Sequence, residues 1–296
     1  MRAGILYAFL AYLCWGLYPL YFRELQHVLV TETLLQRVVW SLLFVLIVLA
    51  LRRRWAWLKS LWASPRQLIR FALAALVLTG NWLVFIWAQT HDRVIDASLG
   101  YFINPLVNVL VGAVLLHERQ RRGQWFAVGV AGAGVLWLTV SAGQLPWVGL
   151  ALAGFWACYG FLRKTARLGA LEGLALETAL LFPFALLGLA LLAGHGESAF
   201  GAGSTSTRLL LIASGPLTSI PLLLFAAGAR RIPFSLLGLL QYVGPTLHVI
   251  IGYWLFGVPF GADKLIGFSL IWSALALYTA EGLWRGRSRS ANLPAG

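Results

Sequence analysis

The sequence predicts an all-α integral membrane protein whose ten transmembrane helices form two inverted five-helix repeats. The chain has 296 residues, of which 60% are hydrophobic and only 11% are charged, whereas about a quarter of the residues in a soluble domain are charged. Apolar segments that are long enough to cross a bilayer recur along the chain. The fourth of these segments also aligns with the ninth, which indicates an internal duplication.

The predicted helices are each roughly 17 to 24 residues long, which is the range that spans a bilayer core. The first segment contains Pro19 and is longer than the apolar region of a cleavable signal peptide, so we expect it to remain as a span. A turn-like stretch at 141–146 separates the fifth helix from the sixth. The ten ranges are 4–22, 33–51, 69–90, 94–116, 123–141, 146–162, 173–193, 208–229, 233–256 and 262–284.

The distribution of positive charge predicts the orientation in the membrane. With the N-terminus inside, 18 of the 23 Lys and Arg residues fall in segments that would face the cytoplasm, as the positive-inside rule requires. Both termini are then cytoplasmic. The net charge of +13 does not indicate a nucleic-acid partner, because the sequence shows neither a basic face nor a stacking platform. We expect the lipid bilayer and a small-molecule substrate as partners, and no nucleic acid.

The duplication divides the chain into two halves. Residues 94–112 align with 234–252 at an offset of 140, which places Pro105 on Pro245 and Asn108 on His248. We expect a first repeat over 1–142, a second over 146–285 and a short cytoplasmic tail over 286–296. Because each repeat has an odd number of helices, the second enters the membrane from the opposite side, as in secondary transporters with a site between the halves.

A polar stripe on the fourth helix is the first candidate site. No charged residue occurs from Ser98 to Leu116, yet Tyr101, Asn104, Pro105 and Asn108 share one helical face there. Polar groups at this depth must face protein or water, because leaving them unsatisfied in hydrocarbon costs several kcal/mol. The stripe therefore predicts a substrate path, although amides and prolines can also simply join helices.

A second stripe on the ninth helix repeats the i, i+4, i+7 spacing with Gln241, Pro245 and His248, and Tyr242 beside it aligns with Phe102. Each proline removes the amide that would bond to the carbonyl four residues earlier, so we expect the Tyr101 and Gln241 carbonyls to lack a helical donor. We expect these residues to line a central cavity, with Asn81, Trp15 and Tyr159 as its walls. For Asn81, an interhelical hydrogen bond explains the residue equally well.

Charged residues near the predicted helix ends are candidates for gating or ion pairs. Asp96 and Arg93 lie where the fourth helix starts, and Glu118 lies at its end. Asp96 is also explained by the helix dipole alone, but it could pair with Arg93 or with Arg37. We expect Arg37, together with Glu32 and Glu177, to lie at the membrane interface.

The sequence has no signature of an enzyme or of a cofactor site. None of the three lysines follows a glycine-rich phosphate loop, and no Cys/His cluster has metal-ligand spacing. We therefore expect no metal and no cofactor. A membrane-embedded enzyme or a non-transporting membrane sensor remains the alternative class. Small residues between Ala127 and Gly134 could pack helices within a monomer or across a homodimer.

Several segments together resemble the RarD-type branch of the EamA-like drug/metabolite transporter superfamily. The resemblance extends over almost the whole chain. It rests on Tyr12-Leu-Cys-Trp15-Gly16, Gln36-Arg37, Asn81-Trp82, the run 97–110 and Leu239-Leu-Gln-Tyr-Val-Gly-Pro245. The chain departs from the family pattern at Gln36, where relatives often have His, and at His248, where they often have Gln.

The resemblance implies a ten-helix inverted-repeat transporter in a bacterial inner membrane. Relatives in the wider superfamily move amino acids, nucleotide sugars and other metabolites, often outward, and the subfamily carries a label of chloramphenicol sensitivity. Together with the stripes, this predicts a secondary-active permease or exporter of small polar or amphipathic metabolites or drug-like solutes. It would work by alternating access around the central cavity.

Overall fold

The computed structural model describes residues 1–53, 55–58, 65–91, 93–141, 143, 147–257 and 261–291. Every regular element in these ranges is a helix. Seven helices there are long and apolar enough to cross a membrane, and a shorter apolar helix covers Leu99–Val114. The seven cover Arg2–Glu24, Val30–Leu51, Pro65–Ala88, Arg122–Ser141, Ala170–Gly194, Thr205–Ala229 and Phe234–Trp254.

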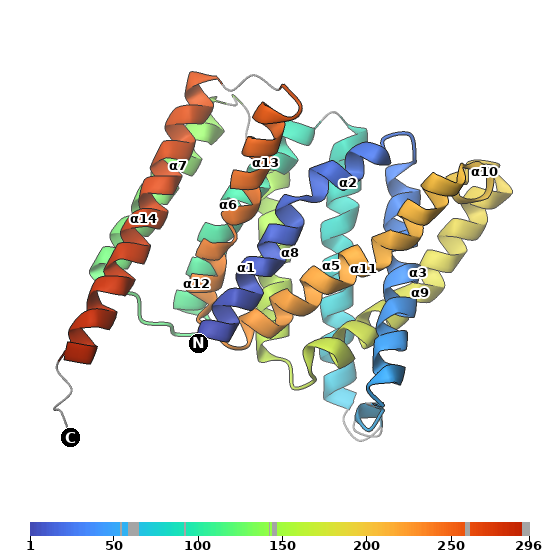
Figure 1. The fold of residues 1–296 in the computed structure, drawn as a ribbon, viewed down its shortest axis with the longest axis horizontal. Helices are drawn as coiled ribbons and strands as arrows, with labels where there is room; N and C mark the ends of the chain where they lie inside the picture. The colour runs from blue at the N-terminus through green and yellow to red at the C-terminus, as the bar shows by residue number, and fades with distance from the viewer. Residues whose placement is uncertain are drawn as a thin grey trace.

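The helices follow the predicted ranges to within a few residues, except that two predicted spans are each divided into two and that α14 continues to Ala291, beyond the predicted end at 284 (Figure 1). Figure 1 also places the start of α1 and the end of α14 on the same side of the molecule. The elements are α1 (Arg2–Gly16), α2 (Tyr18–Glu24), α3 (Val30–Leu51), α5 (Pro65–Thr90), α6 (Val94–Val114), α7 (Arg122–Ser141), α8 (Trp147–Thr165), α9 (Ala170–Gly194), α10 (Ala199–Ala202), α11 (Thr205–Ala229), α12 (Phe234–Leu240), α13 (Val243–Trp254) and α14 (Ala262–Ala291).

The first predicted span is interrupted at Leu17. The Leu17 amide donates to the carbonyls of Leu13 and Cys14, which closes the last turn of α1. Pro19 then falls in the first turn of α2, where its missing N–H has no partner to lose within the helix. A single apolar stretch is therefore folded as two short helices.

The ninth predicted span is broken between α12 and α13, and this corrects one expectation. The Gly244 amide donates to the Gln241 carbonyl at 3.1 Å, so the prediction that Pro245 leaves this carbonyl without a donor was wrong. The break also moves Pro245 into the first turn of α13. In contrast, α6 continues through Pro105 without a break.

The segment between α9 and α11 contains α10, held in place by Glu32 of α3. The Glu32 carboxylate accepts hydrogen bonds from the Ser198 hydroxyl and from the amides of Ala199 and Phe200, at 2.8 to 3.0 Å. A carboxylate at this position satisfies the free amides at a helix start. Glu32 lies in the first turn of α3, near a helix end as the sequence predicted, and its side chain is fully buried against this segment.

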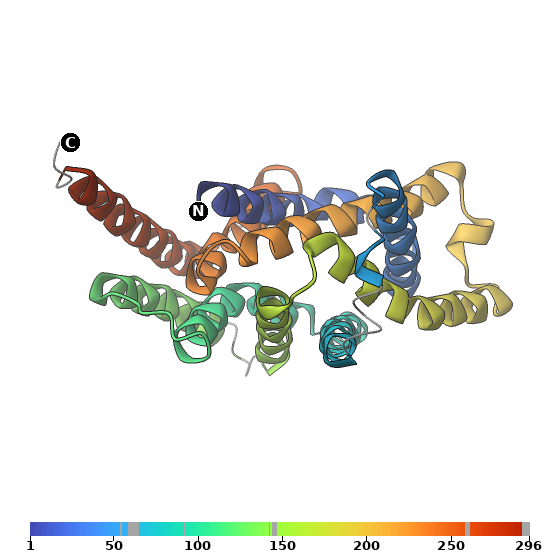
Figure 2. The same cartoon turned by 90° about the horizontal axis from the view of Figure 1, so that it is seen from below.

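The helices form two layers, which Figure 2 shows edge-on. In one layer α1 packs against α11 and α13, and α11 packs against α3. In the other layer α8 packs against α5 and α6, α5 packs against α9, and α6 packs against α7. The most extensive contacts between the layers are those of α3 with α9, α6 with α12, and α7 with α14. Each layer thus contains helices from both predicted repeats.

Aromatic rings fill the interior where α1, α8 and α11 meet. Trp15 lies edge-to-face with Trp156 at 5.2 Å between ring centroids, and Phe225 packs against both rings. Many apolar side chains instead point outward, including Phe184 and Trp254, which are 73% and 83% exposed. Outward-facing apolar residues are expected where lipid replaces water.

Part of the small-residue cluster on α7 packs within the chain. Ala127 and Ala131 are fully buried, and a side chain at Gly134 would lie 2.8 Å from the Gly267 carbonyl of α14. A side chain at Gly129 or Gly132 would meet no described atom within 4 Å.

Candidate functional site

The stripe on α6 is buried at one end and accessible at the other. Asn104 and Asn108 are 6% and 1% exposed, whereas Tyr101 is 39% exposed. Pro105 and Gly112 are also buried. Because Tyr101 lies nearer the start of α6, the stripe leads from an accessible end into a closely packed one.

The closely packed end holds a contact between the two predicted repeats. Asn108 Nδ2 donates to Gln241 Oε1 at 2.9 Å, and both residues are buried. Gly238 of α12 makes this approach possible, because a Cβ there would lie 2.8 Å from the Asn108 Cβ and 2.8 Å from the Pro105 carbonyl oxygen. The two stripes therefore pair with each other.

Glu118 extends this contact beyond the end of α6. Its carboxylate accepts hydrogen bonds from the amides of Phe234 and Ser235 and from the Ser235 hydroxyl. The first turn of α12 is thereby capped by a negative charge, which its free amides and the helix dipole favour. Lys164 Nζ lies 4.0 Å from the same carboxylate. Glu118 thus ties α12 to the loop after α6.

The accessible end of the stripes gathers His248 and Tyr101. The His248 ring lies edge-to-face with Tyr101 at 5.9 Å between centroids. His248 Nε2 lies 3.1 Å from the Trp15 carbonyl oxygen. His248, Tyr101 and Trp15 therefore bring α13, α6 and α1 together at one place.

Arg37 lies on the same side of the protein as His248 and Tyr101, and its side chain is partly buried. Its Nε donates to Thr218 Oγ1 of α11 at 2.8 Å, near the midpoint of that helix. Arg37 is the eighth residue of α3, about 10 Å from the start of that helix at 1.5 Å per residue. An arginine within a membrane span costs about 2.5 to 3.5 kcal/mol on insertion scales, so such residues usually have a function. The sequence predicts that Arg37 lies at the membrane interface, whereas the structure places it two turns into α3.

Aromatic rings surround the Arg37 guanidinium. Its carbon lies 6.0 Å from the centroid of Tyr18, 5.8 Å from Phe22 and 5.8 Å from Trp82. These distances are within the range of cation–π attraction, which partly offsets the loss of hydration. We refer to Arg37, Tyr18, Phe22, Trp82 and Thr218 as the Arg37 box.

The remaining candidate wall residues are occupied by other contacts in this conformation. Asn81 Nδ2 donates to the Leu152 carbonyl at 3.0 Å and joins α5 to α8. The Tyr242 hydroxyl donates to the Phe102 carbonyl at 3.3 Å. Tyr159 is 1% exposed, and its ring stacks on Phe225. Their assignment as cavity residues stays a prediction.

Two gating candidates lie at the start of α6. Arg93 occupies the residue before the first helical position. The side chain of Asp96 lies outside the part of the chain that the structure describes. A pair between these residues therefore also stays a prediction.

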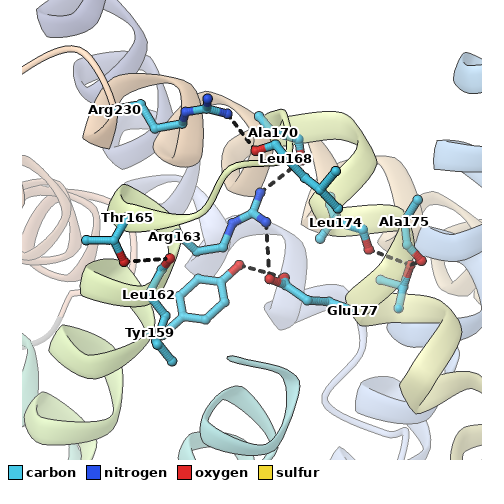
Figure 3. A network of polar contacts seen from close by, with 11 residues as sticks. Tyr159, Leu162, Arg163, Thr165, Leu168, Ala170, Leu174, Ala175, Glu177 and Arg230 are labelled. Carbon is cyan, nitrogen blue, oxygen red and sulfur yellow. Dashed lines mark hydrogen bonds and ion pairs between the residues drawn. The ribbon is translucent and has the colours of Figure 1, made fainter. Parts of the chain in front are cut away.

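Sequence reasoning missed a buried charged network on α8 and α9, shown in Figure 3. Arg163 Nη1 lies 3.2 Å from Glu177 Oε1, and the Tyr159 hydroxyl donates to Glu177 Oε2 at 3.1 Å. Arg163 Nη2 also donates to the Ala170 carbonyl at 2.9 Å. Both charged side chains are almost fully buried. Glu177 was expected at the interface because its position near a predicted helix end gave no sign of a partner.

Two amide oxygens on the α6 stripe are left without a partner. Oδ1 of Asn104 and Oδ1 of Asn108 are buried, and neither accepts a hydrogen bond from any described residue. Buried polar groups usually have partners, and each exception calls for an explanation. These oxygens can accept hydrogen bonds from a polar molecule that enters between α6 and α13.

Comparisons with known proteins indicate that the chain is related to membrane transporters. The model of the EamA-like transporter family matches residues 2–140. The chain is 42% identical to Protein RarD of Escherichia coli strain K12 over 289 residues, with 98% of each chain covered. It is 41% identical to an uncharacterized transporter, YojE, of Bacillus subtilis strain 168, with 98% of each chain covered. A solved crystal structure with a TM-score of 0.72 and 22% identity covers 95% of this chain and 97% of its own.

Proposed function

Since the chain belongs to the EamA-like transporter family, we propose that it is a secondary transporter of small polar or amphipathic solutes. As a multi-pass bacterial membrane transporter of the drug/metabolite superfamily, it needs a site that is reached from each side in turn. In the proposed mechanism, the two halves rock around a central site lined by the α6 and α13 stripes.

The pattern of helix contacts supports ten spans in two inverted repeats, 1–142 and 146–285, followed by a tail at 286–296. If α1, α3, α5 and α6 correspond to α8, α9, α11 and α13, several of the main contacts have a counterpart. The contact of α1 with α11 corresponds to that of α8 with α5, and the contact of α6 with α8 to that of α13 with α1. The three most extensive contacts between the layers each unite a helix with its own counterpart.

The observation that carries the proposal is the difference between the two ends of the stripes. Towards the end of α6, Asn108 pairs with Gln241 and Glu118 caps α12, which closes that side. Towards its start, Tyr101 is accessible and faces His248. Alternating access requires one closed and one open side, with the closed contacts made from side chains that can separate.

The chemistry of the stripes fits a polar or amphipathic solute. The free Oδ1 atoms of Asn104 and Asn108 can accept hydrogen bonds, and His248 offers a ring nitrogen. The rings of Tyr101 and Trp15 can cover an apolar part of the same molecule. The positive-inside charge distribution supports cytoplasmic termini. The protein would work as a monomer or as a homodimer.

Ligand binding can be tested by thermal unfolding of the purified protein. A panel of amino acids, nucleotides, sugars and chloramphenicol-like drugs is screened, because a ligand that binds the folded state raises the melting temperature. We expect a stabilising compound whose effect is lost in His248→Ala. The matched control is Ile250→Ala, two residues further along α13, where the side chain points outward and is 46% exposed.

Counterflow then separates transport from mere binding. Proteoliposomes are loaded with the unlabelled compound found in the screen, and entry of the labelled compound is followed. Accumulation of label above its equilibrium level requires alternating access. A compound that binds through His248 but gives no counterflow would contradict the proposal and favour a non-transporting sensor. Chemical conversion of the compound would instead favour a membrane-embedded enzyme.

A further inference from the structure

We propose that the Arg37 box binds a carboxylate, and that the transported solute is an organic anion with an apolar or aromatic body. This inference rests on the proposed transport function and adds the chemical class of the solute. The observation that points to it is an intramembrane guanidinium with no carboxylate partner among the described residues, surrounded by aromatic rings at the accessible end of the stripes.

The charge of Arg37 is not neutralised within the described part of the chain. The described salt bridges join Arg163 to Glu177 and Lys164 to Glu118, and no described carboxylate lies within ion-pairing distance of Arg37. The single hydrogen bond of its side chain to a described residue comes from Nε to Thr218. Both Nη nitrogens therefore remain available as donors.

A comparison with Arg163 shows what a structural arginine looks like in this protein. Arg163 is 2% exposed, is paired with Glu177 and also donates to a backbone carbonyl. Its charge is paired within the protein, and both of its Nη nitrogens donate to groups of the chain. Arg37, in contrast, is only partly buried, and its two Nη nitrogens donate to no described residue. Of these two arginines, Arg37 is the one that is arranged to bind a negative charge of a solute.

The geometry around Arg37 favours a carboxylate with an apolar body. A guanidinium presents two parallel N–H groups that match a carboxylate. The Thr218 hydroxyl accepts a hydrogen bond from Nε and so fixes the orientation of the guanidinium. The rings of Tyr18, Phe22 and Trp82 supply apolar surface next to the charge.

The Arg37 box is also connected to the α6 stripe. Tyr18 of the box follows Trp15 by three residues, the Trp15 carbonyl oxygen lies 3.1 Å from His248 Nε2, and the His248 ring contacts Tyr101. An anion on Arg37 would therefore leave the rest of the solute among the accessible stripe residues. This places the proposed anion subsite within the transport site itself.

The test compares acids with their uncharged amides. Indole-3-acetate and phenylacetate are titrated against the purified protein at constant ionic strength, in parallel with indole-3-acetamide and phenylacetamide, and binding is followed by thermal unfolding. Each acid and its amide differ in charge but have nearly the same size. The variants are Arg37→Gln and Arg37→Lys. The control is Arg23→Gln, whose guanidinium lies over the Phe256 ring, outside the box.

We expect the acids to stabilise the protein and the amides to have little effect. Arg37→Gln should weaken acid binding by roughly 10- to 100-fold, the range for hydrogen bonds to charged groups. Arg37→Lys should retain part of the affinity, and Arg23→Gln should retain all of it. Gel filtration and the unliganded melting temperature establish that each variant is folded. If Arg37→Gln does not fold, the acid–amide comparison on the unaltered protein decides.

Equal binding of acid and amide, no binding of either acid, or unchanged acid binding by a folded Arg37→Gln would each overturn the anion subsite. These results would leave counterflow of another solute, and hence the transport function, intact. If the acids bind through Arg37 but give no counterflow in proteoliposomes, the subsite stands and the transport function fails. The two proposals therefore fail in different experiments.

Discussion

Asn108 of α6 donates a hydrogen bond to Gln241, at the break between α12 and α13, over a distance of 2.9 Å. The two residues come from corresponding helices of the predicted repeats, and both are buried. Because this bond closes one side of the proposed path, its strength should affect both stability and transport. A bond of moderate strength suits this role, since alternating access has to break it in every cycle.

The first prediction concerns this pair. Asn108→Ala and Gln241→Ala should each slow transport, and the double variant should be little worse than either single one, because both remove the same bond. The coupling free energy should be about 0.6 kcal/mol and at most about 1.7 kcal/mol, as for other hydrogen bonds between membrane helices. A double-mutant cycle of unfolding in detergent measures it. Fully additive effects on transport would show that the pair does not act as a unit.

The second prediction concerns Gly238. Replacing it with Ala would place a methyl group 2.8 Å from the Asn108 Cβ and from the Pro105 carbonyl oxygen. Overpacking of this kind costs about 1 to 3 kcal/mol, so Gly238→Ala should lower the melting temperature and separate α6 from α12.

The matched control for Gly238 is Gly252→Ala in α13. A side chain there meets no described atom within 4 Å, so this substitution should be neutral or slightly stabilising because Ala favours helix. Thermal unfolding of the two variants side by side is the measurement. Equal melting temperatures would argue against close packing of α6 on α12.

The third prediction concerns the buried pair of Arg163 and Glu177. Glu177→Ala leaves the guanidinium buried without its partner, and this should destabilise the protein by about 3 to 5 kcal/mol. Replacing both residues with Met should restore most of the loss, because no unpaired charge remains. Glu197→Ala, at an exposed position, is the control. A double variant as unstable as Glu177→Ala would show that the packing of the network matters more than its charge.

The fourth prediction concerns the cap on α12. Glu118→Ala removes the acceptor for two backbone amides of α12 and should cost about 0.5 to 2 kcal/mol, as for other helix caps. It should also open the closed side of the path, because α12 loses its tie to the loop after α6. Alkylation of a cysteine introduced at Ser235 should then be faster in Glu118→Ala than in the parent. An unchanged rate would mean that the cap does not hold the closed state.

The sequence was sufficient to predict the helices. Their lengths and lack of charge follow from the bilayer, which requires about 20 apolar residues per span and internal hydrogen bonding of the backbone. The stripe of Asn104 and Asn108 was predictable for the same reason, since polar residues in a span must face inward. The break between α12 and α13 was harder to predict, because α6 carries a matching proline and yet continues unbroken.

Which polar groups meet was decided only by the tertiary structure. Glu32, Arg37 and Glu177 each looked interfacial because they lie near helix ends, but the layers bring Ser198, Thr218 and Arg163 against them. These partners lie 166, 181 and 14 residues away in the chain. A periodic pattern reports the face on which a residue lies and its depth, because both are properties of one helix. Whether a charge is neutralised depends on the neighbouring helix, and so the free guanidinium of Arg37 became visible only in the folded protein.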